Sequence, residues 1–207
     1  MTRPATTGGL ALVAVLGLVP HAAEAQVRWD AELAEGVERR VLTSKPPGAG
    51  DAGGGPLFEA SAHVALIPLV RVGAYAHYDV SPVGGQDTRD IYSGGLDLRL
   101  VFPWLRGDVR AYLRVGIGEA MTYAPAHVFV AEGSRPTSLF LAASHGAFTE
   151  VPVALGVLYR VQPRLAFMAE AGTRVGFAFT GNAYRSGSAS GDDSVALSLD
   201  IGVMWGR

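Results

Sequence analysis

Apolar and polar residues alternate along most of the chain from Gln26 onward. A period of two residues is typical of β-strands, in which successive side chains point to opposite faces. The last segment is the clearest case, because every second residue from Val195 to Trp205 is apolar. In segment 165–179 the alternation places Phe177 and Phe179 on the apolar face. The pattern predicts eight strands, near residues 27–42, 58–67, 70–80, 91–102, 109–123, 147–160, 165–179 and 195–205.

The segments between these strands alternate in length. Short connections follow the second, fourth and sixth strands, at residues 67–69, 103–108 and 161–164. Long connections rich in Gly, Pro, Ser and Asp follow the other strands, at residues 43–56, 81–90, 124–146 and 180–193. This arrangement predicts an all-β fold, an eight-stranded antiparallel up-and-down transmembrane β-barrel with short turns on one rim and long loops on the other. No repeat of 20–50 residues indicates a propeller or a solenoid.

The polar face of the strands carries charges of both signs. This face carries nine acidic residues and eight arginines. Lys45 is the one lysine of the chain. Such a near-neutral set favours an interior filled by ion pairs, because an unpaired buried charge costs several kcal/mol. Arginine suits this place because its planar fork binds both oxygens of a carboxylate. The acids are Asp30, Glu32, Glu38, Glu59, Asp79, Asp97, Glu150, Glu170 and Asp200, and the bases are Arg28, Arg40, Arg71, Arg99, Arg110, Arg114, Arg160 and Arg174.

We expect the centre of this interior ion-pair network to comprise Glu59, Asp79, Asp97, Arg99, Arg110, Arg114, Glu170, Arg174 and Asp200. The turn at 103–108 is expected to place Asp97 beside Arg114, where the two side chains form a structural ion pair. The opposite orientation, with the apolar face inward as in a soluble lipocalin-like barrel, is the alternative.

Aromatic residues of the apolar face gather toward the ends of the strands. Outer-membrane barrels carry aromatic girdles at the lipid headgroups, so this placement favours a membrane barrel with outer-membrane lipid as its surroundings. The girdle is predicted to comprise Trp29, Phe102, Trp104, Tyr159 and Trp205 near the short turns, and Tyr78, Tyr123 and Phe177 near the long loops.

Composition narrows the function classes. Of the 207 residues 49% are apolar and 17% charged, the net charge is −2, and cysteine is absent. These values exclude a disordered or nucleic-acid-binding chain, a disulfide-stabilised miniprotein and a cysteine-ligated metal centre.

Residues 1–25 have the features of a cleavable signal peptide. Arg3 precedes an apolar run of about ten residues, which is too short for a transmembrane helix, and Ala23-Glu24-Ala25 is a cleavage site. We therefore expect residues 26–207 to form the exported domain, located in the outer membrane.

With these features the chain resembles the small eight-stranded outer-membrane barrels of the OmpA, OmpX and OmpW type. The resemblance is architectural and implies periplasmic termini and extracellular long loops. Such barrels end in an aromatic residue that the barrel-assembly machinery reads, and Trp205 stands near the end here, followed by Gly206 and Arg207.

Two polar groups are candidate sites, although no catalytic, cofactor or metal residue is assigned. Ser144, His145 and Glu150 have the residue types of outer-membrane lipid A deacylases, but adjacent strand residues point to opposite faces. Glu59, His63, His77 and Asp79 lie on the second and third strands. A turn at Pro68-Leu69 would place Glu59 opposite Asp79, where the set could hold a divalent cation or join the interior network.

The loop at 124–146 contains two apolar stretches, residues 127–130 and 139–142. They either form a protruding sheet with edges for an extracellular partner or fold over the barrel mouth. The leading hypothesis is a barrel with a plugged interior and a structural or interaction role through its loops. A narrow channel for small solutes and a lipid-modifying enzyme are the alternatives.

Overall fold

The computed structural model describes residues 28–42, 54–83, 87–102, 108–124, 127–131, 137–141, 144–181 and 194–206. The predicted signal peptide lies outside these residues. Ten strands occur in them: β1 (Trp29–Leu42), β2 (Gly54–Ile67), β3 (Val70–Val83), β4 (Asp87–Phe102), β5 (Val109–Ala124), β6 (His127–Ala131), β7 (Thr137–Leu141), β8 (Ser144–Gln162), β9 (Leu165–Gly181) and β10 (Ser194–Gly206). In this described part of the chain, no helix meets the length and hydropathy needed to cross a membrane.

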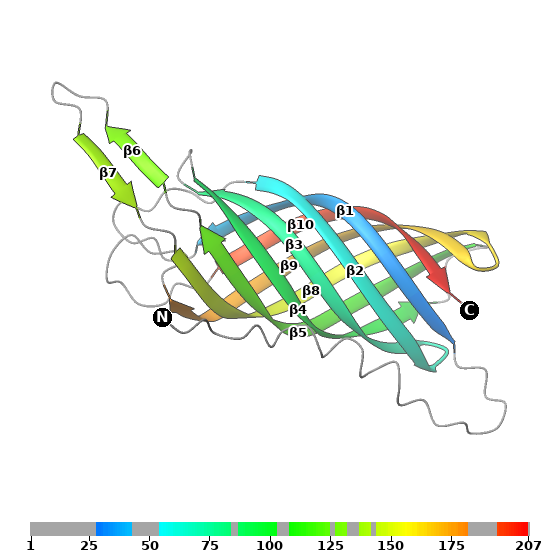
Figure 1. Ribbon diagram of the computed structural model, residues 1–207. Coiled ribbons are helices and arrows are strands. Elements are labelled where there is room, and N and C mark those ends of the chain that lie inside the picture. The colour runs from blue at the N-terminus through cyan, green and yellow to red at the C-terminus, as the bar shows by residue number, and fades with distance from the viewer. Residues whose placement is uncertain are drawn as a thin grey trace, which may run out of the picture.

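Eight of the strands form a closed antiparallel barrel in the order β1-β10-β9-β8-β5-β4-β3-β2 (Figure 1). Each strand pairs with its neighbour in the chain, apart from the β6–β7 insertion, and β1 pairs with β10 to complete the circle. We call the end that carries the Pro68-Leu69 turn, Trp29 and Gly206 the turn rim, and the opposite end the loop rim. The predicted fold class is confirmed.

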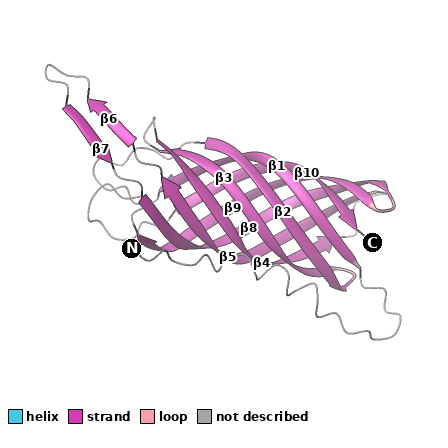
Figure 2. Ribbon diagram, in the orientation of Figure 1, coloured by secondary structure: helices cyan, strands magenta, loops and turns pink. Residues whose placement is uncertain are grey.

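Strands β6 and β7 form a separate two-stranded sheet that projects beyond the loop rim (Figure 2). Its residues pair from His127 with Leu141 to Ala131 with Thr137. Of the two arrangements expected for segment 124–146, the structure has the protruding sheet.

The two faces of each barrel strand differ sharply in exposure. On β10, Leu199 is 60% exposed on the outer wall, whereas its neighbour Asp200 is 2% exposed and lies in the lumen. The same alternation holds on β2, where Phe58 and Ala60 face outward and Glu59 faces inward. The apolar face is therefore the outer wall, as the sequence predicts.

The prediction of a long loop at residues 81–90 is wrong. Strands β3 and β4 continue through most of it, and Val83 pairs with Asp87. The Gly, Pro and Asp content of this stretch is typical of a loop. Polar residues can nevertheless extend a hairpin beyond the apolar belt, where water solvates their side chains.

A β-bulge near the end of β9 reverses the predicted orientation of Phe179. Thr149 pairs with Phe177, but Ala147 pairs with Thr180, so two residues of β9 oppose the single residue Phe148. Ala178 has a φ of 57°, and the extra residue moves Phe179 to the inner face. There its ring stacks on Phe148 at 4.6 Å between centroids.

One glycine makes room for a buried aromatic ring in the lumen. Tyr112 on β5 is fully buried and pairs with Gly156 on β8. A Cβ atom at residue 156 would overlap Cζ and the hydroxyl oxygen of Tyr112. The phenol therefore occupies the volume that a larger residue at 156 would need.

We predict that Gly156→Val destabilises the barrel by about 1–3 kcal/mol, because the valine overpacks against the ring of Tyr112. Equilibrium urea unfolding in phospholipid vesicles measures this cost. The same substitution in a Tyr112→Ala background should cost clearly less. An equal cost in both backgrounds would show that the ring is not the obstacle.

Candidate functional site

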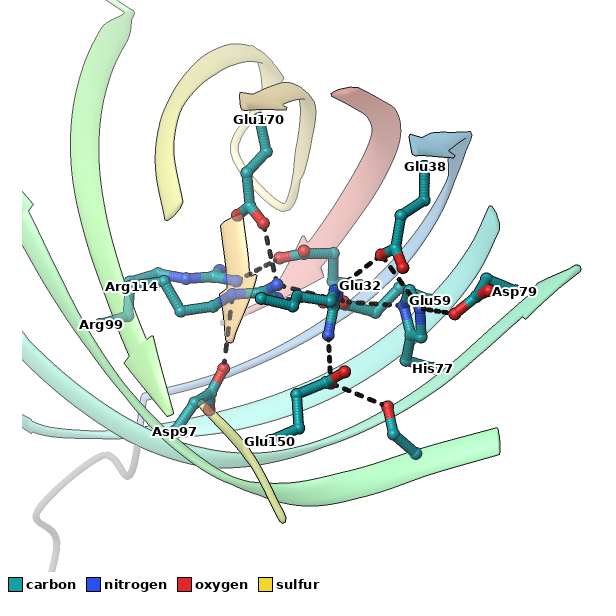
Figure 3. A network of polar contacts seen from close by, with 12 residues as sticks. Glu32, Glu38, Glu59, His77, Asp79, Asp97, Arg99, Arg114, Glu150 and Glu170 are labelled. Carbon is teal, nitrogen blue, oxygen red and sulfur yellow. Dashed lines mark hydrogen bonds and ion pairs between the residues drawn. The ribbon is translucent and has the colours of Figure 1, made fainter. Parts of the chain in front are cut away.

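The lumen of the barrel holds a continuous network of buried charged side chains (Figure 3). All nine acidic residues of the predicted polar face are buried, together with Arg40, Arg99, Arg114 and Arg174. They come from all eight barrel strands because inward positions recur every second residue. The network falls into three regions along the barrel axis.

Near the loop rim, Arg40 and Arg174 bind Glu38 and Glu150. Nη2 of Arg40 lies 2.8 Å from Oε1 of Glu38 and 3.2 Å from Oε2 of Glu150. Arg174 donates from Nη1 to Glu150 at 3.2 Å, and its Nε lies 3.3 Å from Oε2 of Glu38. His77 and Asp79 complete this group, with Nε2 of His77 3.1 Å from Oδ2 of Asp79.

In the centre, Glu59 receives both Arg114 and Arg174. Arg114 also lies 2.8 Å from Oε1 of Glu170, whose other oxygen accepts a hydrogen bond of 2.7 Å from the Tyr112 hydroxyl. Arg114 and Asp97 are 3.9 Å apart, so the predicted bridge between them is the longest contact of this guanidinium. Two arginines on one carboxylate join the central region to the loop-rim region.

Toward the turn rim, Arg99 and His63 hold the remaining acids. Nη2 of Arg99 lies 2.7 Å from Oε2 of Glu32, and its guanidinium lies over the ring of Tyr112 at 4.5 Å. His63 contacts Asp30 through Nδ1 at 3.2 Å and Asp97 through Nε2 at 3.0 Å. Arg71 pairs with Asp30 as well.

Two members of the predicted network stand outside its ion pairs. Arg110 lies toward the turn rim, is only half-buried and makes no ion pair with a described residue. Asp200 is buried in the lumen, yet no cation of the described residues lies within ion-pair distance, and its Oδ1 has no hydrogen-bond partner there. Alternation predicts which face a residue occupies, but it does not predict which charges meet.

The predicted charge balance of the interior is also wrong. Arg28 and Arg160 are exposed at the turn rim, so six arginines of the predicted set, of which Arg71 and Arg110 are only half-buried, oppose nine buried carboxylates. Arg89 adds a partly buried guanidinium at the loop-rim end of β4. The described lumen therefore has a formal excess of two carboxylates before any histidine is protonated.

The structure separates His63 from the other three residues of the predicted metal set. Glu59 pairs with His77 rather than with Asp79, because Pro68 and Leu69 form a tight turn and a bulge between Ala65 and Ile67 shifts the register. His63 is engaged by Asp30 and Asp97. Glu59 lies 3.7 Å from Nδ1 of His77, whereas Asp79 lies at Nε2. The residue that joins Asp79 at Nε2 is Glu38, which sequence spacing could not reveal because it lies on another strand.

The candidate Ser-His-Glu set is not brought together. His145 is exposed on the outer wall, where its ring stacks on Tyr123 at 6.2 Å, whereas Glu150 is buried in the lumen between two arginines. The imidazole and the carboxylate are thus on opposite sides of the barrel wall. The side chain of Ser144 lies outside the described residues.

The aromatic residues of the predicted girdle lie at the strand ends of the outer wall. Trp29 and Trp205 meet edge to face at 5.2 Å at the turn rim, where the exposed Tyr159 and the half-buried Phe102 also lie. Near the loop rim, Tyr78 packs on Tyr92 at 4.9 Å. Tyr123 and Phe177 are exposed there too, and Trp104 lies outside the described residues.

Charged residues on the outer wall were missed by the sequence reasoning. Glu35 and Arg39 on β1 and Glu119 on β5 are exposed among apolar neighbours. Glu35 lines a cavity of about 980 Å³ together with Ala60 and Ala76. The alternation already assigned these positions to the outer face, so a check for charges on that face would have found them.

Comparison of the whole fold with solved structures gives matches over most of the chain. Neisserial surface protein A matches with a TM-score of 0.56 and 17% identity, covering 86% of this chain and 96% of that one. A major outer membrane protein from Thermus thermophilus matches with a TM-score of 0.54 and 14% identity, covering 87% and 99%. The chain has the fold of a small outer-membrane β-barrel. No protein-family model and no curated protein sequence matches it.

The apolar outer wall and the closed sheet agree with this fold. Exposed leucine, isoleucine and valine side chains surround the described barrel, and lipid is the solvent in which such a surface is stable. The protein is an integral outer-membrane β-barrel.

We predict that Arg114→Met destabilises the barrel by about 3–5 kcal/mol, because it leaves Glu59 and Glu170 buried without their shared guanidinium. Urea unfolding in vesicles measures the change. Arg160→Met is the matched control, since its pair with Asp108 is exposed, at 42% and 61% of the two side chains. It should change stability by less than about 1 kcal/mol. Equal effects of the two substitutions would contradict a stabilising role of the lumen network.

Proposed function

We propose that the protein is a plugged, non-conducting barrel that displays its β6–β7 hairpin at the cell surface, with a structural or interaction role. The observation that supports a plugged barrel is that ion pairs cross the lumen. Arg114 on β5 and Arg174 on β9 both reach Glu59 on β2, and Arg40 on β1 reaches Glu150 on β8. In each pair the two strands are three positions apart around an eight-stranded circle.

Such links leave little room for a continuous water path. An eight-stranded barrel is only wide enough for its interior to be filled by side chains. Here that interior contains four buried arginines and the ring of Tyr112 in addition to the acids. This supports a closed lumen over a narrow channel.

The hairpin supports the second half of the proposal. Within the described residues, β6 and β7 pair only with each other, so the outer edge of each strand carries free backbone donors and acceptors. Exposed strand edges are sites at which another extended segment can add to a sheet. We infer an extracellular partner that binds segment 124–146 in this way.

The outer wall and the last strand support two further contacts of this protein. Outer-membrane lipid would surround the exposed apolar residues between the aromatic ends. The outward-facing Trp205 near the end of β10 would serve as the signal for the barrel-assembly machinery.

We expect the purified protein to give no discrete conductance steps in planar lipid bilayers at 100–200 mV. Moving one elementary charge across such a potential corresponds to about 2.3–4.6 kcal/mol. Arg114→Ala with Arg174→Ala removes two crossing side chains and should introduce steps. Steps in the wild-type protein, of the same size in most insertions, would support the channel alternative and contradict the plug.

We expect replacement of residues 127–141 by a short Gly-Ser linker to leave the barrel folded, because no strand of the barrel pairs with β6 or β7 in the described structure. The faster migration of the folded barrel on unboiled gels and its urea midpoint provide the measurements. A loss of folding would show that the hairpin stabilises the barrel rather than being displayed by it.

A further inference from the structure

Three potential metal ligands from two strands meet in the loop-rim part of the lumen. Glu38 on β1 and His77 and Asp79 on β3 are each 3% exposed or less, and one ligand atom from each lies within 4.8 Å of the others. Figure 3 shows the Glu38 and Asp79 carboxylates next to the His77 ring. The residues share this place because β1, β2 and β3 are successive strands with inward-facing side chains.

The spacing of the ligand atoms suits a transition-metal ion. Nε2 of His77 lies 3.1 Å from Oδ2 of Asp79 and 3.5 Å from Oε2 of Glu38. In a tetrahedral site with bonds of about 2.0–2.1 Å, neighbouring ligand atoms are about 3.3 Å apart. Both distances from the imidazole nitrogen are therefore close to those of a tetrahedral site, and the two carboxylate oxygens lie within 4.8 Å of each other.

One oxygen of this group has no hydrogen bond. Oε2 of Glu38 lacks a hydrogen-bond partner among the described residues, although Glu38 is 1% exposed. The other oxygen, Oε1, is held at 2.8 Å by Arg40, which fixes the carboxylate. Oε2 lies 3.3 Å from Nε of Arg174 and 3.5 Å from Nε2 of His77, without a hydrogen bond to either. A buried oxygen with an open lone pair is the kind of atom that a cation satisfies.

The charge around the group also favours a cation. Arg40 and Arg174 are close, with Nε of Arg174 3.3 Å from Oε2 of Glu38, and they oppose a second positive charge. Four buried carboxylates surround them, however, namely Glu38, Glu59, Asp79 and Glu150. Both guanidiniums are shared among these acids, and Arg114, the second guanidinium on Glu59, is itself shared with Glu170. These five acids therefore exceed the three arginines, and a divalent ion would offset the difference.

The second buried histidine provides an internal contrast. His63 also contacts two carboxylates, but Asp30 lies at Nδ1 and Asp97 at Nε2, on opposite sides of the ring. No single ion can reach one ring nitrogen and both of these acids. The convergence of two carboxylates on one nitrogen therefore sets His77 apart.

We propose that Glu38, His77 and Asp79 form a lumenal binding site for a divalent transition-metal cation of the Zn²⁺ class, with water in the remaining position. An imidazole with two carboxylates is a donor set that such ions accept. Cations would reach the site from the loop rim, which lies nearer to these residues than the turn rim.

The test uses the full-length barrel domain in detergent, treated with chelator and carrying His127→Ala and His145→Ala, so that His63 and His77 are the only histidines after residue 25. Isothermal titration with ZnCl₂ should give one site per barrel. His77→Gln and Glu38→Gln should weaken the affinity at least about tenfold, because even outer-shell partners of metal ligands contribute 10–100-fold. His63→Gln is the matched control and should leave the affinity unchanged within about twofold.

A spectroscopic measurement on the unsubstituted lumen keeps the test independent of whether the variants fold. The electron paramagnetic resonance spectrum of one equivalent of Cu²⁺ should show hyperfine coupling to a single imidazole nitrogen. Absence of Zn²⁺ binding by the folded protein, a spectrum without nitrogen coupling, or equal loss in His63→Gln and His77→Gln would each overturn the proposal. Each variant is first checked for the folded band on unboiled gels.

Discussion

The pairing of β1 with β10 is the contact on which the rest of the structure depends. In hydrocarbon an unpaired backbone N–H or C=O costs several kcal/mol, because no water replaces the missing partner. Closing the sheet removes the last two free edges within the apolar belt. Closure in turn separates two environments, so that each strand has one face toward lipid and one toward an interior of fixed width.

That interior explains why the polar face is rich in arginine. A guanidinium can donate to several carboxylates at once, and Arg174 does so by contacting Glu38, Glu59 and Glu150. The chain nevertheless places more acids than arginines in the described lumen. Among the described residues Asp200 has no ion pair and Oε2 of Glu38 has no hydrogen bond, which are two consequences of this excess. The interior is therefore held together by shared cations rather than by separate pairs.

Much of the fold could be predicted from the sequence, because it depends on local periodicity. Alternation alone places Leu199 outside and Asp200 inside, and short turns fix which strands are neighbours. The failures arise where a single residue changes the register. The bulge at Ala178 turns Phe179 inward, and the bulge between Ala65 and Ile67 moves His77 opposite Glu59. Such bulges depend on the pairing of two strands, so neither strand alone reveals them.

The candidate site was less predictable for a related reason. Whether a side chain points into the lumen follows from its odd or even position along the strand. Which charged residue it meets there depends on the tilt and stagger of strands across the barrel. Glu38 meets His77 and Asp79 from a strand two places away, a relation that no spacing along the chain encodes. The outward position of Glu35 is different, because the alternation along β1 already predicts it. What the alternation does not express is the free-energy cost of a charge that faces lipid.

The seam between the first and last strands also bears on how the protein is made. Residues near Trp29 leave the ribosome well before Trp205, which they contact across the seam. A nascent or prematurely terminated chain that lacks β10 retains two unsatisfied edges and cannot enter the bilayer as a smaller version of itself. Closure of the barrel therefore has to wait until β10 has been synthesised.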